Sequence, residues 1–411
     1  NYDFWDSHRD MIVRDRILNN NLLSFEAMNA FGKRGIGNES IYNQGFMFCS
    51  WMVQKYGTDV LKNITKSISY PMNYSINLAM QDATGIWGHE LYVKWKNELY
   101  LSYTKRTKHI IENEEKGTVL LSGGTTNIHP VWSPDEKSFA YLSNLKHDNF
   151  GQTDLFYYNF KDSTSKKIAE GVHTAPSWIN DSTIIYTKRS EPNKWGSKFF
   201  DLYIYTFNDE DERRLTYNSR LISPTYNPVS NQIAAITTYD GTSNVMITTE
   251  LNLTKEDVKF HPITHFDNGM QILSIAWIEK ELFIDAVYNQ GRQIYRVIIE
   301  TGELVPVTAT PWDNRDQNKA PEGMIYAKDQ SGIFNLVLQN DSSEKYITNV
   351  TGGAFMPSVS SDGRILFSLY EDGRYHIAII NRIKEVPRQI VGYEIDYFDQ
   401  DIVSELILGK E

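Results

Sequence analysis

A pattern with a period of about 45 residues recurs through the last three quarters of the chain and limits its fold more than any other feature. The first copy reads Pro-Val-Trp-Ser-Pro-Asp at 130–135, and short β-prone runs follow it. Other copies start at Pro176, Pro224 and Pro357. The first three of these prolines are 46 and 48 residues apart, and the 133 residues from Pro224 to Pro357 make three steps of about 44. Such a period is typical of propeller blades or of solenoid repeats.

Each copy has the chemistry of a small antiparallel sheet. Proline is tolerated where a strand starts and at the second position of a turn. Asp135 can close the turn after the first strand through its own side chain. The runs that follow alternate in polarity and would bury one face against the next copy. Six copies can be counted, of which the fifth, near Asp316, is degenerate. We therefore predict a mainly β protein, with a six-bladed β-propeller over residues 118–395.

The ends of a propeller are commonly tied together, because a shared blade removes an exposed sheet edge. The β-prone run Thr118–Leu121 precedes the first copy, and the last copy contains Tyr375–Ile379. We predict that Val119–Leu121 forms the outer strand of the sixth blade, beside Tyr375–Ile379.

Residues 1–103 have helical periodicity instead. Apolar side chains at 42, 46, 49, 53 and 56 form one stripe of a helix, which Gly57 ends. Similar stripes follow at 60–68, 76–83 and 91–103. We assign 1–103 to an N-terminal α-helical subdomain, 104–117 to a charged connector and 396–411 to a C-terminal tail. Despite the charged connector, we expect the helical part to pack against the propeller.

The propeller copies resemble those of TolB and its relatives, whose hallmark is a Pro-x-Trp-Ser-Pro-Asp-Gly turn. Glu136 stands where that glycine would be in the first copy. The stretches Gly332–Asn335 and Thr348–Pro357 look like propellers that follow clan MA peptidase domains in bacterial envelope proteins. This resemblance implies a periplasmic or otherwise exported protein.

The helical part resembles the C-terminal helices of gluzincin-like peptidases of clan MA, on Tyr42-Asn43-Gln44-Gly45, Tyr56-Gly57, Gly85 and the Leu91–Trp95 spacing. Members of that family hold zinc on a helix that bears His-Glu-x-x-His, and this motif is absent from the sequence. His261 and His265 are four residues apart, but Pro262 lies between them and no glutamate does. The resemblance places the zinc helix upstream of residue 1. We expect no catalytic residue, metal or cofactor in this chain, and zinc only if an upstream catalytic domain exists.

Composition limits the partners. The net charge is −11 and no stripe of Lys and Arg is present, which argues against a nucleic-acid partner. No uninterrupted apolar run approaches the ~18 residues of a membrane-spanning helix. The single cysteine, Cys49, excludes an intrachain disulfide, and its apolar neighbours predict a buried small hydrophobe.

We call the proline that starts a repeat copy its anchoring proline. Residues just before this position in each copy are expected at the mouth of the propeller channel. These candidate partner-binding residues are Asn127, His129, His173, Arg315, Asp316 and Phe355. The alternative is that each is a loop residue satisfied by water. The leading hypothesis is a non-catalytic protein-binding scaffold of the bacterial cell envelope, which holds a protein or peptide at the mouth. The alternative function is the propeller-bearing portion of a zinc metallopeptidase. The sequence does not give the partner or the oligomeric state.

We predict that the purified chain does not hydrolyse peptides when zinc is supplied, because the two histidines and the general base of a gluzincin are missing. A fluorogenic peptide assay with and without a chelator measures this. Chelator-sensitive cleavage together with stoichiometric zinc binding at nanomolar affinity contradicts it.

Overall fold

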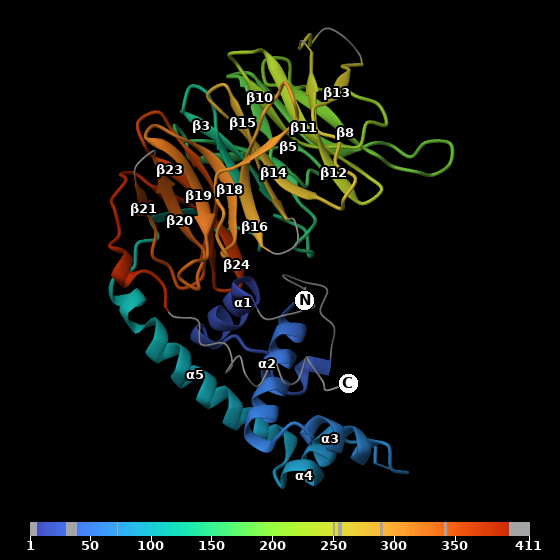
Figure 1. Cartoon of the computed structure of the whole chain (residues 1–411), viewed down its shortest axis with the longest axis vertical. Helices are drawn as coiled ribbons and strands as arrows, with labels where there is room; N and C mark the ends of the chain where they lie inside the picture. Colours follow the sequence, from blue (N-terminus) through green and yellow to red (C-terminus); the bar gives the residue numbers. More distant parts are fainter. Residues whose placement is uncertain are drawn as a thin grey trace.

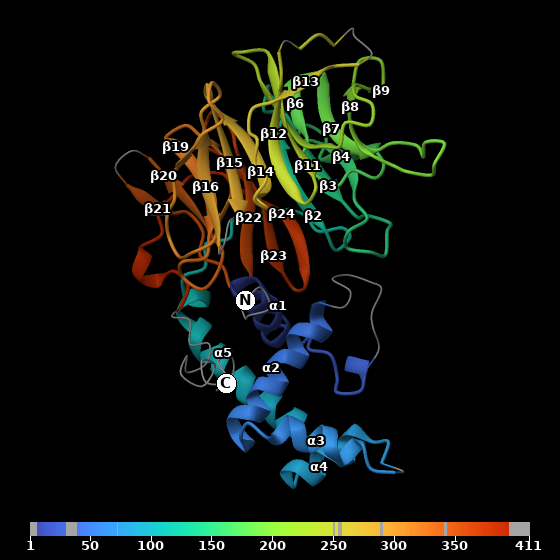
Figure 2. The same ribbon diagram turned by 45° about the vertical axis from the view of Figure 1, so that its right-hand side comes forward.

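A computed structural model describes residues 6–29, 39–71, 73–249, 251–253, 257–287, 291–340 and 343–393. The molecule has a helical part and a ring of sheets, and the helices lie at one end of the ring (Figures 1 and 2). Within the described residues, the strands form six four-stranded antiparallel sheets. The predicted six-bladed, mainly β architecture with an N-terminal helical region is therefore confirmed.

Each blade is a meander of neighbouring strands. The first two blades contain β2 (Asn127–Trp132), β3 (Ser138–Ser143), β4 (Asp154–Asn159), β5 (Thr164–Ala169), β6 (Ser177–Asn180), β7 (Thr183–Arg189), β8 (Phe200–Thr206) and β9 (Asp211–Arg214). The third and fourth contain β10 (Leu221–Asn227), β11 (Gln232–Tyr239), β12 (Thr242–Thr248), β13 (Phe260–Pro262), β14 (Gln271–Ile278), β15 (Glu281–Val287), β16 (Arg292–Val297) and β17 (Leu304–Pro306). The last two contain β18 (Asn314–Ala320), β19 (Gly323–Lys328), β20 (Asn335–Gln339), β21 (Glu344–Tyr346), β22 (Gly353–Val359), β23 (Ile365–Glu371) and β24 (Arg374–Ile380).

The ring closes through a strand from the other end of the chain. Strand β1 (Thr118–Leu121) pairs antiparallel with β24, and Thr118 lies opposite Ile379. Leu120 and Leu121 pack against a buried cluster that joins the first and sixth blades. The predicted closure by Val119–Leu121 is confirmed.

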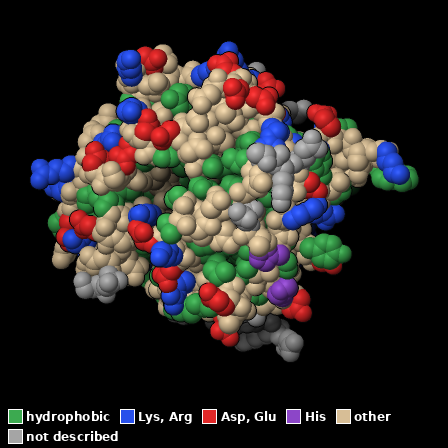
Figure 3. All heavy atoms as spheres, turned by 90° about the horizontal axis from the view of Figure 1, so that it is seen from above, with side chains coloured by type: hydrophobic (Ala, Val, Ile, Leu, Met, Phe, Trp, Pro, Cys, Tyr) green, Lys and Arg blue, Asp and Glu red, His purple; other side chains and the backbone are tan. Residues whose placement is uncertain are grey.

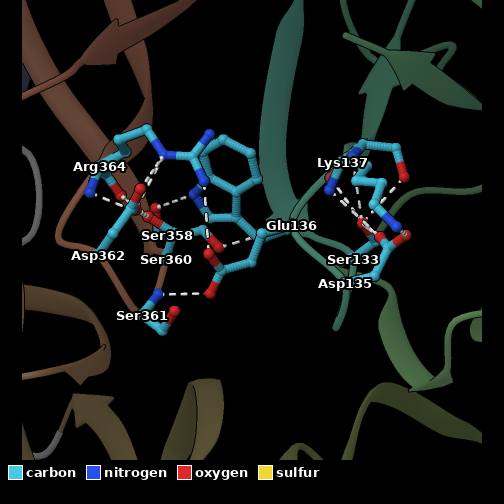
Figure 4. A network of polar contacts seen from close by, with 11 residues as sticks. Ser133, Asp135, Glu136, Lys137, Ser358, Ser360, Ser361, Asp362 and Arg364 are labelled. Carbon is cyan, nitrogen blue, oxygen red and sulfur yellow. Dashed lines mark hydrogen bonds and ion pairs between the residues drawn. The ribbon is translucent and has the colours of Figure 1, made fainter. Parts of the chain in front are cut away.

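A second tie joins the same two blades on their inner strands (Figure 4). Trp132 donates its indole N–H to the carbonyl of Ser358 at 3.1 Å, and the Arg364 guanidinium lies 4.5 Å from the Trp132 ring centroid. Glu136 adopts φ +56, the left-handed region that favours glycine. Its carboxylate accepts hydrogen bonds from the Ser361 N–H and from Arg364. Glutamate adopts this backbone conformation less readily than the usual glycine, but its side chain links the two blades.

The helical part contains α1 (Ser7–Leu18), a 3-10 turn (Ala27–Asn29), α2 (Glu39–Tyr56), α3 (Val60–Ile68), α4 (Ile76–Thr84) and α5 (Gly88–Glu112). The last helix continues through most of the predicted connector, because its buried stripe extends through Tyr103 and Thr107 to Ile110. The charged residues that suggested a connector lie largely on the exposed side of this helix. The division into domains remains a prediction, and the tail 396–411 lies outside the described residues.

The structure also tests two smaller predictions. Cys49 is half-buried rather than fully buried. In the described part of the chain, no helix is long and apolar enough to cross a membrane.

Helix α1 is bound to the ring by buried polar contacts. Arg14 donates to the carbonyls of Thr351 and Gly352 at 2.6 and 2.8 Å, and it forms a buried ion pair with Asp10. The next residue, Asp15, accepts the backbone N–H groups of Asp372 and Gly373 with its carboxylate. The helical part therefore packs against the ring, as we expected.

Replacement of residues 118–121 by Gly-Ser-Gly-Ser is predicted to lower the free energy of unfolding by several kcal/mol. The change removes Leu120 and Leu121 from the cluster between the first and last blades, and apolar burial is worth ~25 cal/mol per Å². Urea unfolding measures the effect, and Val119→Ser, at a partly exposed position of the same strand, is the control. An unchanged midpoint for the four-residue replacement contradicts the closure model.

Candidate functional site at the propeller channel

The inner strands of the six blades enclose a cavity of about 330 Å³. Four prolines at equivalent places line it: Pro130, Pro176, Pro224 and Pro357. An inner strand is the edge of its blade, so a proline there removes no hydrogen bond from the sheet ladder. The anchoring prolines of the repeat are therefore channel-lining residues.

The inner strands bulge where they line this cavity. His129, Ser223, Asp316 and Met356 all have φ between +51 and +60. The pairing register slips at each of these points, for example between Ile128 and Val131. A bulge bends its strand and re-aims a side chain. This shared backbone feature places one residue from each of four blades on the cavity wall.

Three of the six predicted mouth residues line the cavity: His129, His173 and Asp316. The other three lie outside its lining. Asn127 is buried, where it donates to the carbonyls of Gly123 and Tyr375. Phe355 is buried against other aromatic rings. A partner-binding role for the six remains a prediction.

Arg315 lies on β18 of the fifth blade, outside the lining of the cavity. Its guanidinium pairs with the carboxylate of Asp313 and lies 4.5 Å from the Phe334 ring centroid. In the first turn of α1, burial lowers the pKa of His8, and the charge of the nearby Arg315 lowers it further. Burial and the nearby Asp313 raise the pKa of Asp329 to about 6. The first turn of α1 therefore lies beside the fifth blade.

The fourth blade contributes lining residues that sequence reasoning missed. Leu273, Ser274 and Trp277 line the cavity, and Leu273 is 47% exposed. This copy lacks the anchoring proline by which we located the mouth residues in other copies. Alignment of Ile275-Ala276-Trp277 with Pro130-Val131-Trp132 is the signal that would have found them.

An ionic network joins the fourth and fifth blades beside the cavity. Arg292 donates to Asp285 at 2.6 Å and lies 3.4 Å from an Asp316 carboxylate oxygen. The Asp316 backbone N–H donates to Asp285 at 2.8 Å. Burial raises the pKa of Asp316, Asp285 adds to the rise, and Arg292 and Arg315 oppose it. The charged groups at this wall are therefore engaged with one another.

His129 is a half-buried titratable group that the first blade contributes to the cavity lining. Burial lowers its pKa to about 4, and the positive charge of Arg292 contributes to the lowering. At neutral pH the imidazole is uncharged, so it can donate one hydrogen bond and accept another. It offers a ligand polar contacts without adding charge to the cavity.

The described residues contain no group of three or more His, Cys, Asp or Glu side chains arranged to hold a metal ion. His261 belongs to the outer strand β13 of the third blade, and both it and His265 are exposed.

Comparison with known proteins gives structural neighbours only. No family model matches the chain, and no curated protein matches it. TolB from Acinetobacter baumannii is similar with a TM-score of 0.39 and 16% identity, over 65% of this chain and 57% of TolB. Oligogalacturonate lyase from Vibrio parahaemolyticus has a TM-score of 0.44 and 14% identity, over 66% of this chain and 80% of the lyase. The tricorn protease has a TM-score of 0.44 and 12% identity, over 67% of this chain and 27% of the protease.

Likeness at this level carries no information on activity, and the six-bladed ring rests on the strand pairing itself. The resemblance of the helices to clan MA peptidases remains a prediction.

We predict that His129 makes the protein less stable in mild acid. The unfolded chain takes up this proton near pH 6.5, whereas the folded chain takes it up near pH 4. Stability supplied by the neutral imidazole is complete above pH 6.5 and is lost as the pH falls toward 4. Urea unfolding at pH 7 and pH 4 should show the advantage of wild type over His129→Gln shrinking by at most about 3 kcal/mol. The same difference at both pH values contradicts the prediction.

Proposed function

We propose that this chain is a non-catalytic protein-binding scaffold of the bacterial cell envelope. The observation that supports it best is the mutual pairing of Asp285, Arg292 and Asp316 beside the cavity. A general base or nucleophile must be available to the reacting group. Charges that satisfy one another instead make a stiff frame, and binding favours such preorganisation.

The channel beside these paired charges can accept a polypeptide side chain or terminus. Its lining combines apolar side chains such as Leu273 and Met356 with the polar groups of His129 and His173. Ligand sites typically have such a mixture of apolar walls and a few polar groups. The envelope location is supported by the sequence resemblance of Gly332–Asn335 and Thr348–Pro357.

Site-specific photo-crosslinking tests this function. A benzoylphenylalanine at position 173 reports on the mouth, and one at the exposed position 166 of the outer strand β5 is the matched control. We expect a discrete adduct with one protein of the native cell envelope from position 173 and none from position 166. The scaffold proposal fails if position 173 gives no adduct, or if both positions give the same products.

A second candidate function is the propeller-bearing portion of a larger zinc metallopeptidase, and the exposed apolar surface of the helical part favours it. The exposed large apolar side chains of this part are Tyr42, Leu61, Ile68, Tyr70, Tyr74, Ile76, Trp87, Val93, Tyr100, Leu101 and Ile111. Exposed apolar side chains mark a contact surface where they form a contiguous patch. Hydroxyl-radical footprinting of a polypeptide that includes upstream sequence discriminates the candidates: protection of Tyr74 and Leu101 relative to this chain supports the second, and unchanged labelling opposes it.

A further inference from the structure

The second blade carries a surface unlike the rest of this acidic chain. The loop that joins β7 to β8 projects from the ring as a long hairpin, on the right in Figure 1. Its residue Trp195 is 78% exposed, and Tyr217, on the loop that joins β9 to β10 of the third blade, is 50% exposed. We define the blade-2 patch as Arg189, Lys194, Trp195, Lys198, Tyr217 and Arg220.

The two loops of the patch are held in one arrangement. The buried Asp201, at the base of the hairpin, accepts the backbone N–H groups of Asn218 and Ser219 at 3.1 and 2.9 Å. It also pairs with Arg214 at 2.6 Å. Within the hairpin, Ser190 donates its N–H to the carbonyl of Phe199 at 2.7 Å. The surface is therefore preformed, which lowers the entropy that a partner must overcome.

The cations of the patch are not neutralised within the protein. Among described residues, Arg189, Lys194, Lys198 and Arg220 form no ion pair, whereas the neighbouring Lys188 pairs with Glu212. Glu191 is the one acidic residue in the sequence from 189 to 199. Elsewhere acidic and basic side chains are interspersed, as on the face turned away from the helices in Figure 3. A local excess of positive charge on a chain of net charge −11 indicates an anionic partner.

Aromatic rings place these cations at the surface. The Arg189 and Arg220 guanidinium groups lie 5.0 and 5.2 Å from the ring centroids of Phe200 and Phe199, and the Lys194 ammonium lies 5.0 Å from the Trp195 ring. A guanidinium stacked in this way keeps its N–H groups available for a carboxylate.

We propose that the blade-2 patch docks an acidic segment of another polypeptide. The inference rests on the proposed function, since it assumes a protein partner, and it specifies the partner's chemistry and a contact outside the channel. Trp, Tyr and Arg are the side chains that dominate protein-binding hot spots. A membrane surface fits less well, because guanidinium groups cover the rings of Phe199 and Phe200, and that of Arg214 lies 4.3 Å from the Tyr217 ring centroid. Trp195 is the one ring of the patch that no guanidinium covers, and it is 78% exposed.

Fluorescence anisotropy with the full chain tests the proposal. The probe is a short fluorescein-labelled peptide of repeated Glu-Glu-Tyr units, and a Gln-Gln-Tyr peptide is the neutral comparison. The test variant is Lys194→Ser/Trp195→Ser/Lys198→Ser, in an exposed loop where folding should be unaffected. The control variant Lys62→Ser/Lys66→Ser removes the same charge from exposed positions of α3. A parallel arm measures sedimentation with phosphatidylglycerol vesicles.

We expect the acidic peptide to bind wild type and the control variant equally. It should bind the test variant at least tenfold more weakly, and its binding should weaken at high salt. Absence of binding, equal binding to all three proteins, or patch-dependent binding to vesicles alone overturns the inference. Crosslinking from position 173 separates the two proposals: an adduct there without peptide binding refutes only the patch. Peptide binding that the test variant loses, without an adduct from 173, refutes only the role of the mouth.

Discussion

The rest of the structure depends on the fact that every blade has two apolar faces. All six residues of β3 are buried, so side chains on both faces of that sheet are removed from water. The buried clusters accordingly join neighbouring blades, such as Ala234 and Ile236 of the third with Leu282 and Ile284 of the fourth. A single blade does not satisfy this constraint, and an open row leaves two faces exposed. Closure of the ring is what allows each blade to fold.

This constraint explains why the architecture could be predicted from the sequence. The Pro-x-Trp spacing marks the inner strand of a blade. Trp132 and Trp178 each donate an indole N–H to the inner strand of the preceding blade in the ring. The closing strand was predictable because an unpaired edge at the sixth blade required a partner. Helix α5 extends into the predicted connector, whose charges are typical of a tether, because the buried stripe of the helix continues through them to Ile110.

A second repeat escaped sequence reasoning. Thr216, Thr264, Thr308 and Thr348 each accept a backbone N–H from the third strand of their own blade: Leu202, Val245, Ile294 and Leu336 respectively. An apolar residue precedes each of them, in Leu215-Thr216 for example. A threonine is common in any strand, so the pattern has meaning only once the blades are aligned.

The candidate site was half predictable for a local reason. Alternation along a strand tells which residues share a face, but a bulge changes the count. The left-handed backbone at His129 and Asp316 lies at such a slip, and these two residues line the cavity, whereas the neighbouring Arg315 pairs with Asp313 outside the lining. Aspartate and histidine are enriched among residues with positive φ, but this enrichment does not single out one position, so the φ of +60 at Asp316 was not predictable from the sequence. The backbone conformation of single residues therefore determines which candidates line the cavity, and the repeat pattern does not specify this.

The pairing of β1 with β24 also sets an order of events during synthesis. Thr118 and its partner Ile379 are 261 residues apart in the sequence. At typical elongation rates of about 5–20 residues per second, the closing strand waits roughly 13 to 52 s for its partner. The carbonyls of Thr351 and Gly352 that bind Arg14 emerge similarly late. Helix α1 and strand β1 are made before the sixth blade that they contact, and a ribosome-bound nascent chain lacking that blade carries both without these partners.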